Sequence, residues 1–151
     1  MLYNRDIIYL HRRYLFLKTF TAESIINHSC RDIFNTFVKS AKLNFPNFKE
    51  KRAVGTYCNQ KKNKRFKVEI TAFEKDKLYE ITSSNRRESC TTRYHLIPLS
   101  ENETKIVFTE IESDRNVFGN INSFLTSLLL GKRQPDEFNT FIKNLGQSLE
   151  H

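Results

Sequence analysis

The sequence of 151 residues has no tryptophan, four glycines, three prolines and three cysteines. Rossmann and P-loop nucleotide-binding folds need glycines where the backbone approaches phosphates, so the shortage of glycine excludes both. Cys30, Cys58 and Cys90 form neither a disulfide framework nor a Cys-x-x-Cys motif, which argues against a small secreted disulfide-rich domain. There is also no His-Glu-x-x-His motif and no paired Cys/His spacing. We therefore predict no metal site, no cofactor and no catalytic residue set.

Long apolar runs are missing as well. No stretch of 18 apolar residues occurs, so a transmembrane helix is excluded. Arg12 and Arg13 interrupt the apolar segment 7–17, and no small-residue cleavage site follows it. We therefore expect no signal peptide. Together with the odd number of cysteines, this predicts a cytoplasmic protein in a reducing compartment.

What is present is the composition of one ordinary globular domain. Hydrophobic residues make up 38% of the chain and charged residues 28%, and 13 phenylalanines and six tyrosines supply much of the apolar share. A chain of this length buries roughly 70% of its unfolded surface, which is enough for a single core.

The positive charge is local. Lys and Arg number 25 against 17 Asp and Glu, but eight of the positive residues and one negative residue lie between Lys49 and Lys67. The rest of the chain is nearly neutral, so the basic composition does not predict a nucleic-acid surface over the whole protein. The segment 49–67 has two interpretations. It is either a solvated hairpin whose tip, 61–64, blunts edge pairing, or a surface that weakly binds an anionic partner, as a protein or RNA interaction module would.

The hydrophobic pattern first indicates a strand and then a short helix. Residues 16–27 alternate loosely and predict the strand. Ser29, followed three residues later by Asp32, is an N-cap signal. Apolar residues then recur at helical spacing and predict a helix over Cys30–Ser40.

From about residue 53 the hydrophobic period changes to two. Phe66, Val68, Ile70 and Ala72 share one face of the first predicted strand. Short polar turns follow at spacings typical of an antiparallel meander. The strands are predicted over residues 66–72, 78–83, 89–98 and 104–111.

The C-terminal part returns to a helical period. Apolar residues in 117–129 and again in 138–145 predict a long helix that is interrupted. Gly131 and Pro135 break it, and Pro135 suits the first position of the second part.

This order of elements gives an α+β fold. It resembles the helix-grip fold of the START-related (SRPBCC) superfamily of lipid-transfer and polyketide-cyclase proteins. The resemblance rests on the strand-to-helix entry 25–34, the paired segments 94–99 and 104–110, and the Gly-Lys-Arg break at 131–133 before the last helix. More narrowly, the chain is similar to a family of unknown function from Gram-positive bacteria. The resemblance implies a curved antiparallel sheet of six to seven strands around a long C-terminal helix, with short helices after the first strand.

The resemblance also implies the domain limits. It covers residues 18–147, so we expect an N-terminal extension at 1–17 and a single helix-grip domain at 18–148. We interpret residues 149–151 as the start of an affinity tag.

Proteins of this superfamily usually enclose a cavity for an apolar molecule between sheet and helix, and the resemblance implies a lining. The candidates are inward-facing apolar side chains together with Glu110, which shares the strand parity of Ile106 and Phe108. The predicted ligand-binding residues are Phe34, Phe37, Phe66, Val68, Ile70, Tyr79, Ile81, Tyr94, Leu96, Phe108, Glu110, Phe124, Leu128, Phe138 and Phe141. The other interpretation of this set is a plain core that phenylalanine rings fill completely.

Glu110 also carries an enzyme hypothesis. A carboxyl group in apolar surroundings has a raised pKa and can transfer protons, which would suit a cyclase- or hydrolase-like activity. The alternative is a carboxylate in solvent or paired with Arg93. His95 is expected on the outer surface if Tyr94 and Leu96 face inward.

The leading hypothesis is a non-catalytic domain that holds a small hydrophobic or amphipathic molecule. Apolar burial at about 25 cal/mol per Å² would provide the affinity, and Tyr94 or Glu110 would orient the molecule. The segment 118–130 is interpreted as the mouth of the cavity in preference to a membrane-surface anchor. Packing of this segment on the sheet is the remaining interpretation.

Overall fold

The computed structural model describes residues 3–10, 15–59, 66–86, 89–113 and 137–150. Strands and helices follow one another in the order that the hydrophobic periods predict, with further strands at residues 3–10 and 57–59. The elements are β1 (Tyr3–Leu10), β2 (Leu15–Ile26), α1 (Cys30–Asn44), the 3-10 helix η1 (Glu50–Arg52), β3 (Tyr57–Asn59), β4 (Lys67–Glu74), β5 (Leu78–Ser84), β6 (Ser89–Ser100), β7 (Glu103–Ser113) and α3 (Glu137–Leu149).

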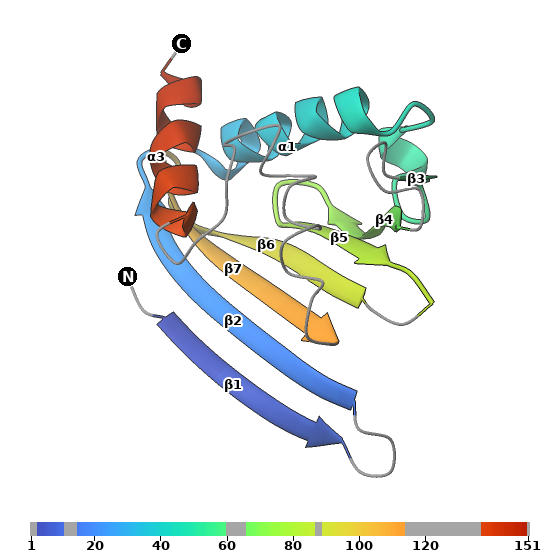
Figure 1. The fold of residues 1–151 in the computed structure, drawn as a ribbon. Helices are drawn as coiled ribbons and strands as arrows, with labels where there is room; N and C mark the ends of the chain where they lie inside the picture. The colour runs from blue at the N-terminus through green and yellow to red at the C-terminus, as the bar shows by residue number, and fades with distance from the viewer. Residues whose placement is uncertain (1–2, 11–14, 60–65, 87–88, 114–136, 151) are drawn as a thin grey trace.

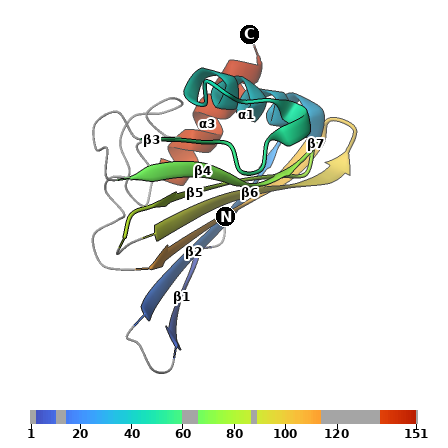
Figure 2. The same ribbon diagram turned by 90° about the vertical axis from the view of Figure 1, so that its right-hand side faces the viewer.

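The seven strands form one antiparallel sheet in the order β1-β2-β7-β6-β5-β4-β3. The meander β3 to β7 pairs sequential strands, and β7 then pairs with β2. The sheet is curved, and both α1 and α3 lie on its concave side (Figures 1 and 2). The α+β helix-grip prediction is thereby confirmed.

Helix α1 begins and ends where its sequence dictates. Ser29 is the N-cap, and its side-chain oxygen accepts a hydrogen bond from the backbone N–H of Asp32 at 3.1 Å. The helix continues to Asn44, four residues beyond the predicted end. Phe45 then leaves the helical conformation, as expected for a residue before a proline. The apolar face of α1 is buried against the sheet. It consists of Ile33, Phe34, Phe37, Val38 and Ala41.

A β-bulge in β4 changes which residues face inward. The register with β5 shifts between Ile70 and Ala72. As a result Ala72 pairs with Glu80, and Phe73 pairs with Tyr79 on the concave side. The predicted alternation therefore holds through Ile70 but is wrong at Ala72, because the extra residue reverses the parity.

The segment expected as an N-terminal extension contains a strand. β1 pairs with β2 along its whole length, from Tyr3 opposite Ala22 to Leu10 opposite Leu15. The sequence pattern did not indicate this strand. The expected helix over 117–129 and the breaks at Gly131 and Pro135 lie outside the described residues, while α3 contains the predicted C-terminal stripe.

Candidate functional site in the concave face of the sheet

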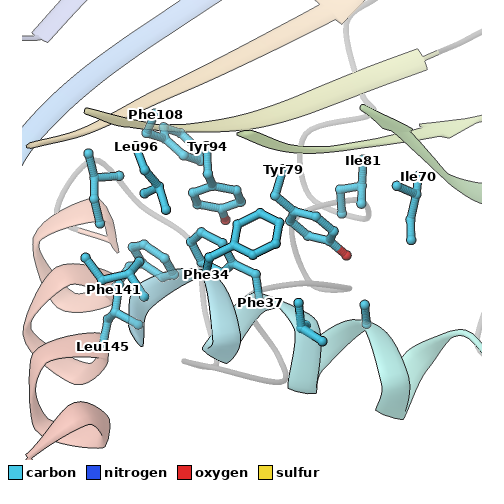
Figure 3. Packing of buried hydrophobic residues seen from close by; sticks show 14 of the residues in the cluster. Phe34, Phe37, Ile70, Tyr79, Ile81, Tyr94, Leu96, Phe108, Phe141 and Leu145 are labelled. Carbon is cyan, nitrogen blue, oxygen red and sulfur yellow. The ribbon is translucent and has the colours of Figure 1, made fainter. Parts of the chain in front are cut away.

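The half of the concave face beneath the two helices is aromatic. Tyr79, Tyr94 and Phe108 lie side by side on β5, β6 and β7. Phe37 of α1 packs on both tyrosines, with ring centroids 5.7 Å from Tyr79 and 4.9 Å from Tyr94. Phe141 of α3 reaches Tyr94 at 5.3 Å. Figure 3 shows these rings filling the space between sheet and helices.

The next two rows of the same face are polar. The cross-strand neighbours of the first row are Ile81, Thr92 and Glu110. Those of the second row are Ser83, Cys90 and Glu112. The four polar residues are all buried: Ser83 is 0% exposed, Thr92 1%, Glu110 1% and Glu112 2%. These two rows lie near the C-terminal end of β7. The arrowhead of β7 marks this end in Figures 1 and 2, and it lies away from α1 and α3.

Two observations describe the chemistry of these polar rows. The Cys90 thiol donates to Oε1 of Glu110 at 3.5 Å. Ser83 Oγ is buried with no hydrogen-bond partner among the described residues. Phe66 packs against Cys90 and forms the apolar border of this region. Buried polar atoms are normally paired, so the Ser83 hydroxyl needs an explanation.

Thirteen of the residues predicted to line the interior are described, and all of them are buried. Phe34, Phe37, Phe138 and Phe141 come from the helices, and the others come from the sheet and from Phe66 just before β4. Phe124 and Leu128 lie outside the described residues, as does the proposed mouth at 118–130. The inward orientation of Glu110 is as strand parity predicted.

Ser83, Thr92, Cys90 and Glu112 were not among the predicted site residues. A signal for Glu112 was present, because it has the same parity as Glu110 on one strand. Ser83 lies on β5 and Cys90 and Thr92 lie on β6. Only the cross-strand register brings them beside the two carboxyl groups of β7.

The Tyr79 side chain is buried in the aromatic half of the concave face. Burial raises the pKa of Tyr79 above its ordinary value of 10.0, and the nearby Cys58 adds to the shift. The cause is desolvation, which penalises the phenolate. Tyr79 therefore contributes a neutral hydroxyl to the interior.

The convex face carries a separate polar network. Glu80 accepts hydrogen bonds from Thr71 Oγ1 at 2.7 Å and from Arg93 Nε at 2.5 Å. Arg93 therefore pairs with Glu80 and lies on the opposite face from Glu110. His95 is exposed between the buried Tyr94 and Leu96, as predicted.

The enzyme hypothesis predicts Glu110 inside a water-accessible pocket and would fail if this side chain were fully exposed. Glu110 is 1% exposed and therefore buried. No cluster of three or more His, Cys, Asp or Glu side chains that could hold a metal ion occurs among the described residues. Within the same residues, no helix is long and apolar enough to cross a membrane. All three cysteines are free thiols.

The basic segment is part of a hairpin, since β3 pairs with β4 from Tyr57 opposite Glu69 to Asn59 opposite Lys67. Lys67 is neutralised locally, because its Nζ lies 2.9 Å from Oε1 of Glu69 and 4.7 Å from the centroid of the Tyr57 ring. Lys49, Lys51 and Arg52 are exposed. The predicted tip at 61–64 lies outside the described residues.

A surface groove of about 480 Å³ lies between α1 and the end of α3. Its walls include Asp32, Lys39, Lys42 and Glu50, and Lys42 Nζ lies 3.8 Å from a Glu50 oxygen. Because these walls are charged and exposed, the groove does not suit an apolar molecule.

The fold has counterparts among solved structures. The protein MLL2253 from Mesorhizobium loti superimposes with a TM-score of 0.57 at 16% identity, covering 87% of this chain and 96% of that one. A point mutant of norcoclaurine synthase from Thalictrum flavum, in complex with a transition-state analogue, gives a TM-score of 0.56 at 8% identity, with 92% and 98% covered. PFC0360w, an HSP90 activator from Plasmodium falciparum, gives 0.54 at 16% identity, with 87% and 96% covered. These likenesses support the helix-grip fold and carry no activity to this chain.

At the level of sequence, residues 20–131 match the family described as "Domain of unknown function (DUF3284)". No curated protein matches the chain.

Proposed function

The chain belongs to the DUF3284 family of domains of unknown function, and we propose that it binds one small hydrophobic or amphipathic molecule between the concave face of the sheet and the helices. The observation that carries the proposal is the composition of that face. Buried carboxyl and hydroxyl groups lie directly beside a continuous aromatic wall. Ser83 Oγ in these rows is buried with no hydrogen-bond partner among the described residues, and a bound molecule would supply one.

The aromatic wall would hold the apolar body of the molecule, and the polar rows would orient it. Pockets for small molecules combine these two elements, a mostly apolar lining and a few placed polar groups. We also propose a cytoplasmic location, which the three free thiols support.

Native mass spectrometry of the purified protein tests this function directly. We expect the purified protein to carry a bound molecule that solvent extraction releases. If it carries none, we expect exposure to dodecan-1-ol to give an adduct with one molecule per chain. A clean mass that stays unchanged with dodecan-1-ol would show that the rings and polar groups form a closed core, and would overturn the proposal.

A bulky substitution locates the binding region. Thr92 lies at the junction of the aromatic and polar rows, so Thr92→Phe should fill the space for the molecule and weaken dodecan-1-ol binding at least tenfold. Thr91→Phe, one residue away on the convex face, is the matched control and should leave binding unchanged. Circular dichroism of both variants shows whether each is folded. Equal binding by a folded Thr92→Phe protein would place the molecule elsewhere.

A further inference from the structure

Positive charge is concentrated in the segment that leads from α1 to the edge strand β3 (Figure 1). Lys49, Lys51 and Arg52 lie in or next to η1, and all three are exposed. Glu50, the acidic residue among them, lies 3.8 Å from Nζ of Lys42 at the end of α1. The other three form no ion pair with a described residue, so their charge is available to a partner.

Exposed apolar side chains lie in the same segment. Leu43, at the end of α1, is 79% exposed, and Val54, two residues after η1, is 59% exposed. Among the described residues, five large hydrophobic side chains are exposed, and three of them are Leu43, Val54 and Tyr57. Single exposed apolar residues are common on protein surfaces, but apolar residues that gather in one region mark an interaction surface.

The backbone of this segment is held in place. Thr56 Oγ1 donates to the carbonyl oxygen of Arg52 at 3.2 Å, and the N–H of Gly55 donates to the carbonyl oxygen of Ile70 on β4 at 2.9 Å. Ala53 is 3% exposed and belongs to the core. The exposed side chains on either side of Ala53 therefore share one fixed support. We name Lys42, Leu43, Lys49, Lys51, Arg52 and Val54 the α1–η1 patch.

We propose that the α1–η1 patch docks the protein on the surface of a membrane that contains anionic lipids. The cationic side chains face the lipid phosphates, to which basic residues are attracted. Leu43 and Val54 enter the boundary between head groups and acyl chains, where apolar side chains add to the electrostatic attraction. This inference goes beyond the proposed function and does not depend on it, because docking requires no molecule in the interior.

The composition of the patch favours a lipid surface over a nucleic acid. Proteins that bind single-stranded nucleic acids combine positive charge with aromatic rings on which the bases stack. Tyr57 is the exposed aromatic residue nearest to the patch in sequence, and Nζ of Lys67 already lies over its ring, 4.7 Å from the centroid. The patch itself offers aliphatic side chains, which are stabilised by transfer from water into lipid.

Vesicle sedimentation tests the role of the charge. Vesicles of phosphatidylcholine are compared with vesicles in which about one third of the lipid is phosphatidylglycerol. We expect at least tenfold tighter binding to the anionic vesicles, and a decrease in that binding as salt is added. Lys49→Gln/Lys51→Gln/Arg52→Gln should weaken the binding about a hundredfold, because each basic residue near an anionic surface contributes roughly fivefold.

A charge-matched variant separates the patch from the net charge of +8, which attracts anions in general. Arg31→Gln/Arg86→Gln/Lys143→Gln removes three exposed positive charges outside the patch and should weaken vesicle binding by less than about threefold. Circular dichroism shows that both triple variants are folded. Equal losses in the two variants would mean that the net charge alone drives binding, and would overturn the inference.

A fluorescent side chain tests the apolar contact. The sequence contains no tryptophan, so Leu43→Trp places a single indole in the patch. Its emission should shift to shorter wavelength on addition of anionic vesicles, because the ring leaves water for the interface. The control is Leu99→Trp near the end of β6, a position that is 46% exposed in the wild type, and its emission should not shift.

The remaining outcomes identify what would replace this inference. Absence of binding to anionic vesicles at low salt would overturn it. Tighter binding to poly-uridylate RNA than to anionic vesicles, lost in the patch variant, would assign the patch to nucleic acid instead. Vesicle binding without a shift of the Leu43→Trp emission would show that the aliphatic side chains stay in water, and would also overturn it. Failure to bind dodecan-1-ol would overturn the proposed function alone.

Discussion

The concave face of the sheet has an aromatic half and a polar half, and the buried residues of the two halves differ in their contacts. In the aromatic half, Phe37, Tyr79 and Tyr94 contact one another through their rings, and two helices cover them. In the polar half, Glu110 and Glu112 are buried to the same degree without contributing apolar surface. The same strands carry both halves, so the difference comes from side-chain chemistry and not from backbone geometry.

This difference teaches how stability and binding are divided in the molecule. Burial of a phenylalanine ring stabilises the folded state by kilocalories, while a buried unpaired hydroxyl destabilises it. We infer that the aromatic half mainly holds the fold together and that the polar half is retained for recognition. Three substitutions test this division.

The largest effect is expected from Phe37→Ala in the aromatic half. Phe37 is fully buried between α1 and two tyrosines, and removal of such a ring costs about 3–5 kcal/mol of unfolding free energy. Urea denaturation followed by circular dichroism measures the change. Leu43→Ala on the same helix is the control, because Leu43 is 79% exposed and its truncation should stay within about 0.5 kcal/mol. Equal effects in the two variants would contradict the role of the aromatic half.

A pH-dependent effect is expected from Tyr79. Burial raises the pKa of Tyr79 in the folded state above the ordinary 10.0 that applies in the unfolded chain. Below pH 10 both states keep the proton, so the contribution of Tyr79 is fully present. Above pH 10 the unfolded state loses the proton first, and the unfolding free energy falls by up to about 1.4 kcal/mol per pH unit. The loss continues until the pH passes the folded-state pKa.

Tyr79→Phe removes this part of the alkaline destabilisation. We expect the unfolding free energies of wild type and variant, measured by urea denaturation between pH 8 and 11, to converge or cross as the pH rises past 10. Parallel curves over this range would show that the Tyr79 hydroxyl titrates normally in the folded protein.

The smallest effect, and of opposite sign, is expected from Ser83→Ala in the polar half. Removal of a buried hydroxyl that has no partner among the described residues should raise the unfolding free energy by about 1 kcal/mol. Ser84→Ala on the other side of the strand should change it by less than about 0.5 kcal/mol. A gain in stability together with weaker dodecan-1-ol binding would support a recognition role. A loss of stability would instead assign Ser83 to the structural core.

Much of the fold could be predicted because its signals are local. The N-cap at Ser29, the helical stripe that contains Phe34 and Phe37, and the alternation through Tyr94 and Leu96 all depend on neighbours within a few residues. The inward orientation of Glu110 followed from the same alternation. The strand β1 escaped prediction because its stability depends on pairing with β2, and a pattern within 3–10 alone does not reveal that partner.

The sequence by itself determined the class of fold, the order of its elements and the set of side chains that face inward along most strands, since hydrophobic period and capping act over short distances. Only the tertiary structure decided which of those side chains meet. The bulge after Ile70 turned Phe73 inward in place of Ala72. The strand register placed Ser83 and Cys90 in one row with Glu112. Both depend on hydrogen bonds between different strands, so parity within a single strand does not specify them.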